Sequence, residues 1–99
     1  LEKKGILIYK MRADEHDRIM AHSQAVAFLF GRIGRELQFN EGPLDTVGFK
    51  HLMQNQKIYQ GDSEQLLLDM FLYNRYAREM LERVERTVGD FSKLIKKKF

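Results

Sequence analysis

The chain has 99 residues, of which 43% are hydrophobic and 31% charged, a composition typical of one small globular domain. One proline and no cysteine or tryptophan argue against a disulfide-stabilised secreted protein and predict a helical, cytoplasmic one. No apolar run approaches the ~20 residues that a membrane span needs, and we expect neither a membrane segment nor a signal peptide.

The net charge of +3 comes largely from lysines near the two ends of the chain. These residues are Lys3, Lys4, Lys93, Lys96, Lys97 and Lys98. A basic tail can bind nucleic acid or an acidic membrane, but no recognition helix or aromatic stacking platform accompanies this one. We therefore interpret these lysines as solvated and predict no nucleic-acid partner and no membrane partner.

Residues 5–11 form a continuous apolar run of strand length. A strand without polar alternation is typical of a parallel sheet that is buried on both faces, and no other stretch of the chain could pair with it. We therefore expect residues 1–11 to be the last strand and linker of a preceding α/β domain. Residues 12–99 would then form a helical domain.

Residues 14–39 predict a first long helix with Asp14 as its N-cap. The segment 24–30 is apolar on more than one face of this helix, and such a helix must be surrounded by other elements. A chain of 99 residues offers few elements for that purpose, so we expect a homodimer. Gly31 and Gly34 predict that another helix crosses closely here.

Two breaks divide the rest of the chain. Gly42 and Pro43 form the clearer one, since the glycine can end one helix and the proline can occupy the first turn of the next. Residues 60–63 (Gln-Gly-Asp-Ser) form the second break. Between the two, residues 44–59 have poor periodicity and predict one or two short helices with irregular joints.

A second long helix is predicted over residues 63–88 or longer, because apolar residues recur at alternating steps of three and four. Asn74 interrupts this seam: it either fixes the register of helix pairing, or it faces a ligand cleft or caps a neighbouring helix. Gly89 can bend or break the helix near its end. The predicted fold class is all-α, with two long helices and a short helical insert in an intertwined homodimer, preceded by a residual strand.

The three histidines do not predict a metal site. His16 and His22 are six residues apart, which does not place two ligands on one helix face. His51 has no acidic partner at a recognisable interval. His22 stands beside Ser23 and Gln24 where the first helix becomes apolar, and this polar group is the first candidate for a site. A histidine with satisfied hydrogen bonds between helices is the competing interpretation.

Lys50 follows Gly48 in a segment that could hold a carboxylate, the glycine admitting the ligand and the lysine neutralising it. The alternative is an ordinary surface lysine beside a glycine. The sequence contains no Ser-His-Asp arrangement, so we assign no catalytic residue. Spacing alone therefore predicts a helical association domain with a candidate anion site.

Three short motifs resemble the helical C-terminal domain of prephenate dehydrogenases. Glu-His-Asp at residues 15–17, followed by Gln24, resembles the opening of that domain after the last strand of a nucleotide-binding domain. Gly-Phe-Lys at residues 48–50 resembles a second segment of the family. Asp-Met-Phe-Leu-Tyr-Asn at residues 69–74 resembles the Asp-Ile-Phe-x-x-Asn pattern that begins its long last helix. The three motifs occur in the family's order.

The resemblance implies an interlocked all-helical dimer in a full-length enzyme whose amino-terminal Rossmann domain binds NAD or NADP. Such an enzyme oxidatively decarboxylates prephenate or arogenate in tyrosine biosynthesis, with the substrate between the two domains. His22, Gln24 and Lys50 are then expected to line the substrate site. This sequence lacks a glycine-rich strand-to-helix turn, so we expect the fragment to bind no cofactor and to be inactive alone.

Three positions depart from the family pattern. Phe28 and Gln54 stand where many members carry a histidine and an arginine, and Leu67 stands where an aromatic residue is common. The basic groups would bind the substrate's carboxylates, so either other cations such as Lys50 and Arg32 replace them or the substrate differs. The alternative function is a non-catalytic helical dimerisation or regulatory domain that has kept the scaffold.

Overall fold

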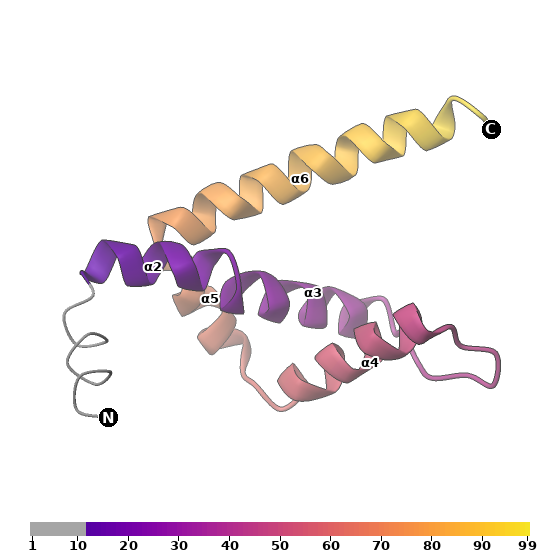
Figure 1. Ribbon diagram of the computed structural model, residues 1–99, viewed down its shortest axis with the longest axis horizontal. Coiled ribbons are helices and arrows are strands. Elements are labelled where there is room, and N and C mark those ends of the chain that lie inside the picture. Colours follow the sequence, from indigo (N-terminus) through magenta and orange to yellow (C-terminus); the bar gives the residue numbers. More distant parts are fainter. Residues whose placement is uncertain (1–11) are drawn as a thin grey trace.

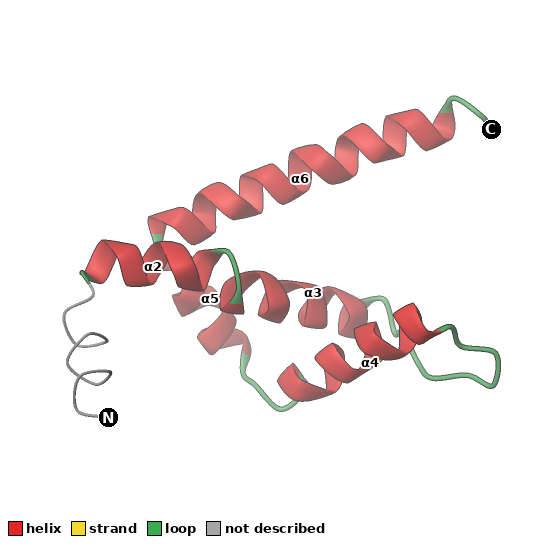
Figure 2. Cartoon of the chain, in the orientation of Figure 1, coloured by secondary structure: helices red, strands yellow, loops and turns green. Residues whose placement is uncertain are grey.

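The computed structural model describes residues 12–99, and the strand predicted at residues 5–11 lies outside this range. The described residues form α-helices and the turns that join them, which confirms the all-α prediction (Figure 1 and Figure 2). The helices are α2 Ala13–Ala21, α3 Gln24–Glu36, α4 Val47–Tyr59, α5 Glu64–Leu72 and α6 Arg75–Lys96. None of them is long and apolar enough to cross a lipid bilayer.

The described chain has two arms that diverge from a common junction (Figure 1). In one arm α3 and α4 pack against each other and run in opposite directions. The other arm is α6, which contacts α2 and α5 near its start and then extends away from α3. The molecule consequently measures 55 × 31 × 25 Å. A single copy leaves much of α6 uncovered.

The first long helix is divided in two, so the prediction of one helix over residues 14–39 was wrong. The division falls at His22 and Ser23, between α2 and α3. Nδ1 of His22 lies 2.8 Å from the carbonyl oxygen of Arg18, and the Ser23 hydroxyl donates to that of Ile19 at 2.7 Å. These side chains compete with backbone N–H groups for the last carbonyls of α2, which ends the helix.

The second long helix is also divided, contrary to the prediction of one helix over residues 63–88. Asn74 separates α5 from α6 and is the N-cap of α6. Its side-chain oxygen accepts from the N–H groups of Tyr76 at 3.0 Å and Ala77 at 3.2 Å. Its side-chain nitrogen donates to the carbonyl of Asp17 in α2 at 2.8 Å. Asn74 therefore starts a helix and ties it to α2, and it does not act as a register residue within one long helix.

The insert between the divided helices is a single helix, α4, which is one of the two predicted alternatives, and the irregular joints are not found within it. Thr46 is its N-cap and accepts from the backbone N–H of Phe49 at 3.2 Å. Pro43 therefore lies in the loop before α4, outside its first turn. The second predicted break is confirmed, because Ser63 caps α5 by accepting from the N–H of Leu66 at 3.1 Å.

The close helix crossing predicted at Gly31 and Gly34 is confirmed by the packing of α4 on α3. A Cβ atom at Gly31 would lie 3.2 Å from Cδ2 of Tyr59, and one at Gly34 would collide with the side-chain oxygen of Gln56. Phe28 is 1% exposed beside this crossing, and its ring stacks on Tyr59 with 5.0 Å between centroids. The two glycines thus allow α4 to approach α3 closely.

Alanine at Gly89 and alanine at Gly31 should change stability in opposite directions. α6 continues through Gly89 without the break that was considered, and a Cβ added there would meet no described atom within 4 Å apart from its chain neighbours and the backbone of its own helix. Gly89→Ala should raise the free energy of unfolding by roughly 0.5–1 kcal/mol through helix propensity. Gly31→Ala should lower it, because the new methyl group would press on Tyr59. Urea denaturation at one protein concentration measures both, and equal shifts would argue against a tight crossing.

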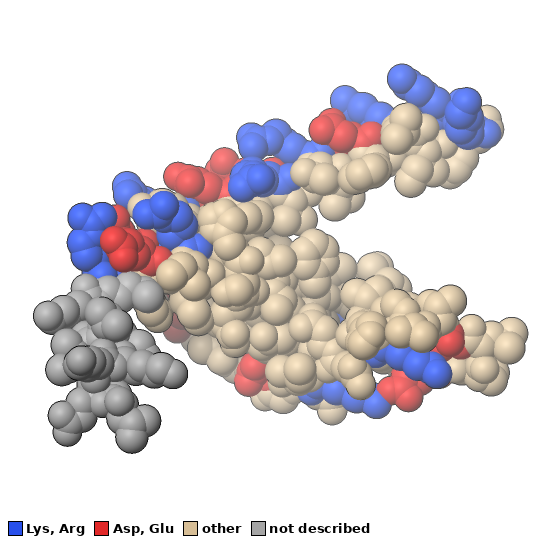
Figure 3. All heavy atoms as spheres, in the orientation of Figure 1, with Lys and Arg blue, Asp and Glu red and all other residues tan. Residues whose placement is uncertain are grey.

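The apolar core of a single copy is small. Among residues 12–99, the buried hydrophobic residues are Ala21, Ala25, Phe28, Met53 and Ala77. Large apolar side chains remain exposed on α3 and α6, among them Phe30, Ile33, Leu37, Val88, Phe91 and Ile95. In Figure 3 the charged side chains lie along the outer edges of the two arms, while uncharged side chains line the edges that face each other. One copy therefore does not surround its own apolar helices.

Candidate functional site

The break between α2 and α3 holds the polar group that the sequence predicted as a site. The carbonyl of Arg18 can only accept, so the neutral His22 ring carries its proton on Nδ1 and leaves Nε2 as an acceptor. The Ser23 hydroxyl donates to the carbonyl of Ile19 and makes no capping bond to α3. His22 and Gln24 are exposed beside these uncapped first-turn N–H groups. These N–H groups carry a partial positive charge, which favours the binding of a carboxylate.

Lys50, the third predicted site residue, lies at the opposite end of the same arm. It belongs to the first turn of α4, whose start packs beside the end of α3 (Figure 1). α3 has 13 residues, and a rise of 1.5 Å per residue puts Gln24 about 18 Å from its last residue. One copy therefore brings His22 and Gln24 together but keeps Lys50 apart from them.

A pocket of about 250 Å³ lies beside Lys50 at the start of α4. It is lined by Glu41, Gly42, Asp45, Lys50, Gln54 and Lys57. Glu41, Asp45 and Lys57 were not among the site residues predicted from the sequence. Steps of four and three from Lys50 through Gln54 to Lys57 place these residues on one helix face. This shared face can be recognised only when residues 47–59 are known to form one continuous helix.

Arg32, considered as a replacement cation, is already engaged in ion pairs. Its guanidinium lies 3.2 Å from Glu36 and 3.4 Å from Glu64, and its side chain is only 20% exposed. These contacts tie α3 to the start of α5. Phe28 is likewise a core residue, so no ligand reaches position 28. Lys50 and Lys57 are the cations that line the pocket.

Two guanidinium groups lie against the ring of Tyr76 at the junction of α2 and α6. Cζ of Arg75 is 4.8 Å from the ring centroid and Cζ of Arg18 is 5.8 Å from it. Arg75 also donates to the Tyr76 hydroxyl at 2.8 Å, and this hydrogen bond is the main cause of the raised pKa of Arg75. Arginine is fully protonated near neutral pH, so the shift leaves its charge unchanged there.

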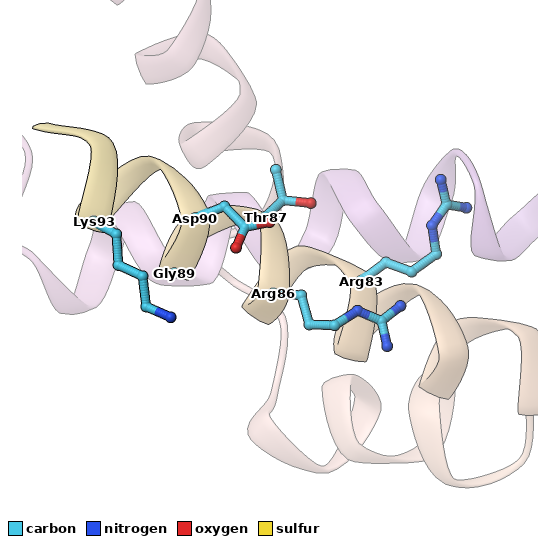
Figure 4. Close-up of a pocket in the computed structure, with 6 residues that line it drawn as sticks. All are labelled: Arg83, Arg86, Thr87, Gly89, Asp90 and Lys93. Carbon is cyan, nitrogen blue, oxygen red and sulfur yellow. The ribbon is translucent and has the colours of Figure 1, made fainter.

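A further polar hollow of about 390 Å³ lies on the outer, charged face of α6 (Figure 4). It is lined by Arg83, Arg86, Thr87, Gly89, Asp90 and Lys93. All six residues belong to one helix, and Figure 4 shows Asp90 between Arg86 and Lys93. Charges of both signs at helical spacing are typical of a solvated helix face. We do not assign a site here.

Neither a metal-binding cluster nor a dinucleotide-binding turn is found in the part of the chain that the structure describes. Within residues 12–99, no three histidine, cysteine or acidic side chains lie close enough together to hold a metal ion. The same residues contain no strand, and hence no glycine-rich strand-to-helix turn of the kind that cradles a dinucleotide.

Comparison with known proteins gives consistent matches. Residues 33–99 match the family model described as the TYRAAT1-like C-terminal domain. Arogenate dehydrogenase 1, chloroplastic, of Arabidopsis thaliana is 36% identical over 81 residues, which cover 82% of this chain and 13% of that protein. Arogenate dehydrogenase 2, chloroplastic, of the same plant is 31% identical over 84 residues, which cover 85% of this chain and 24% of that protein. The matched segment is thus less than a quarter of either relative.

Proposed function

We propose that this chain, which belongs to the family of TYRAAT1-like C-terminal domains, dimerises a prephenate or arogenate dehydrogenase and lines the substrate site of that enzyme. In this proposal the chain is the helical carboxy-terminal domain of such an enzyme. The whole enzyme would oxidatively decarboxylate arogenate or prephenate in tyrosine biosynthesis. NAD or NADP would accept the hydride and would be bound by an upstream Rossmann domain. The much greater length of both relatives supports an additional domain.

The observation that carries this proposal is the separation of the candidate residues within one copy. His22 and Gln24 flank the uncapped start of α3, and Lys50 lies near the other end of that helix. A substrate with two carboxylates needs positive charge at two places. In an interlocked dimer, Lys50 of the partner subunit can approach the start of α3 in the first subunit. A composite site of this kind would contain both halves.

The uncovered apolar surfaces support a homodimer as the assembled form. Val88, Phe91 and Ile95 line an almost entirely apolar groove of about 390 Å³ along the end of α6. On α3, Phe30 and Ile33 are exposed, and Phe30 lines a pocket with Met80 and Val84 of α6. Contiguous apolar surface of this kind is unusual on a monomer and marks an interface. A second copy supplies a matching surface by symmetry.

Substitution of Lys50 in the full-length protein is the direct test of the substrate-lining role. The wild-type protein should oxidise arogenate or prephenate with NAD or NADP, and the 99-residue chain alone should not. Lys50→Gln should lower kcat/KM roughly 10- to 100-fold, because a hydrogen bond to a charged group is worth ~1.5–3 kcal/mol. Steady-state kinetics with both substrates measures the effect.

Lys98→Gln is the matched control, since it removes a lysine from the far end of the chain and should leave kcat/KM unchanged. Dehydrogenase activity of the isolated 99-residue chain would refute the proposal that an upstream domain binds the cofactor needed for the reaction. Absence of arogenate and prephenate affinity in a full-length protein that still binds NAD or NADP would favour the alternative function.

That alternative is a non-catalytic dimerisation or regulatory domain. Two positions favour it: Phe28 is buried in the core, and Gln54 carries no charge. Neither residue can replace the basic groups that the family resemblance leads us to expect. Both relatives are named as chloroplastic proteins, and the cytoplasmic location expected for this chain stays a prediction.

A further inference from the structure

The short helix α5 is more apolar than one copy of the chain can bury. Met70 and Phe71 pack against the core alanines at the junction of the two arms, yet no residue of α5 is buried. Leu68 and Leu72 lie one turn apart and share another face of the helix, where they are 47% and 57% exposed. Tyr73, the next residue, is 80% exposed. These three side chains form a second apolar surface, here called the α5 surface.

The α5 surface adjoins the start of α2. Leu72 and Tyr73 line a pocket of about 400 Å³ together with Ala13, Asp14 and Asp17 of α2. Figure 1 shows α5 at the same end of the molecule as the start of α2. Because Ala13 is the first residue of α2, this pocket lies where the chain enters the helical domain.

The two arginines that line this pocket, Arg75 and Arg78, already have partners within the chain. Arg78 donates to the carbonyl groups of Phe71 and Leu72 at the end of α5. Arg75 donates to the hydroxyl of Tyr76 at 2.8 Å. A partner that covers the α5 surface therefore needs apolar side chains more than it needs carboxylates.

The position of this surface favours an upstream domain over a second copy as its occupant. The apolar groove of α6 lies elsewhere, since a rise of 1.5 Å per residue puts Phe91 about 24 Å from Arg75 along the helix. The strand expected at residues 5–11 lies outside the described range. On the expectation that it ends the upstream domain, only Arg12 separates that domain from Ala13, a reach of about 8 Å at most. A domain held so closely must contact the surface beside Ala13.

We propose that the α5 surface docks the upstream nucleotide-binding domain, which covers Leu68, Leu72 and Tyr73 with apolar side chains of its own. The inference rests on the upstream domain of the proposed function and adds which face of the helical domain holds it. Interfaces between domains of one chain resemble protein–protein interfaces, with an apolar centre and a polar rim. The upstream domain and the second copy would then bind near opposite ends of α6.

Limited trypsin digestion of the full-length protein tests this docking. The Arg12–Ala13 bond joins two exposed residues of the described chain at the edge of the pocket, so a docked domain should protect it. Leu68→Glu and Leu72→Glu each place a charge in the interface and should speed cleavage of this bond roughly 10-fold or more. Tyr73→Ser is a milder change and should speed it less. Mass spectrometry identifies the fragment that begins at Ala13.

Leu44→Glu is the matched control, because Leu44 is 94% exposed in the loop before α4, far from the start of α2 (Figure 1). It should leave the cleavage rate unchanged. Sedimentation velocity of the same variants identifies the occupant, since substitutions on the α5 surface should not change the dimer dissociation constant. A rise in that constant without faster cleavage would show that a second copy covers this surface, and would overturn the inference.

Equal cleavage rates in the wild type and in α5 variants that remain folded by circular dichroism would also overturn it. A wild-type protein in which the Arg12–Ala13 bond is the first to be cut would do so even if every variant failed to fold. The digestion needs no substrate. A full-length protein that oxidises neither arogenate nor prephenate, yet protects this bond, would therefore overturn the proposed activity and leave the docking inference standing.

Discussion

Replacing Phe91 by glutamate should convert the proposed dimer into a monomer at micromolar concentration. Phe91 lies on the apolar side of α6, where it is 58% exposed in one copy and lines a groove with Val88 and Ile95. Burying such a side chain contributes ~1.5–3 kcal/mol, and a two-fold symmetric interface contains it twice. The substitution should therefore raise the dimer dissociation constant by roughly 10²- to 10⁴-fold.

Sedimentation velocity over a dilution series measures this change directly. Lys93→Gln is the matched control, because it also lowers the chain's charge by one but lies on the outer, charged face of α6. The control should sediment as the wild type does. A wild type that sediments as a compact monomer at micromolar concentration would refute the dimer, since the apolar edges of α3 and α6 would then be stable in water.

The sequence was sufficient for the fold class because the helical signals come from residue spacing. Gly31 and Gly34 correctly indicated a close crossing, and residues 60–63 correctly indicated a break between helices. The two helix breaks that were missed share another cause. At His22 and at Asn74 the chain is redirected by side chains that bond to backbone groups, while the apolar periodicity continues through the break. The apolar periodicity does not reveal such a break, because it depends on which helix faces are apolar and not on which backbone carbonyls accept a side-chain hydrogen bond.

The candidate site was predictable only for residues that lie close together in the sequence. His22 and Gln24 are only two residues apart in sequence, so their proximity follows from the chain itself. Glu41 and Lys57 come together only because the loop before α4 folds back onto that helix, and their ion pair has no local sequence signal. Residues 44–59 seemed irregular because α4 buries a narrow face, with Met53 its one fully buried residue in a single copy. The other apolar residues of α4 do not lie on that face.

Asn74→Ala should strongly destabilise the junction of the two arms. The change removes the bonds to the N–H groups of Tyr76 and Ala77 and the bond to the carbonyl of Asp17. Loss of an N-cap costs about 1 kcal/mol, and loss of a partly buried hydrogen bond costs about another. We therefore expect the free energy of unfolding to fall by roughly 2–3 kcal/mol in urea denaturation.

Asn74→Ser separates the two contributions. Serine keeps the capping oxygen but is too short to reach α2, so this variant should lose only the bond to Asp17, about 1 kcal/mol. All variants must be compared at one protein concentration, because dimerisation adds a concentration-dependent term to stability. The junction sets the direction in which α6 leaves α2, so Asn74→Ala should also weaken dimerisation although the residue lies outside the apolar groove. An alanine variant as stable as the wild type would show that packing among Ala21, Ala25 and Ala77 alone holds the arms together.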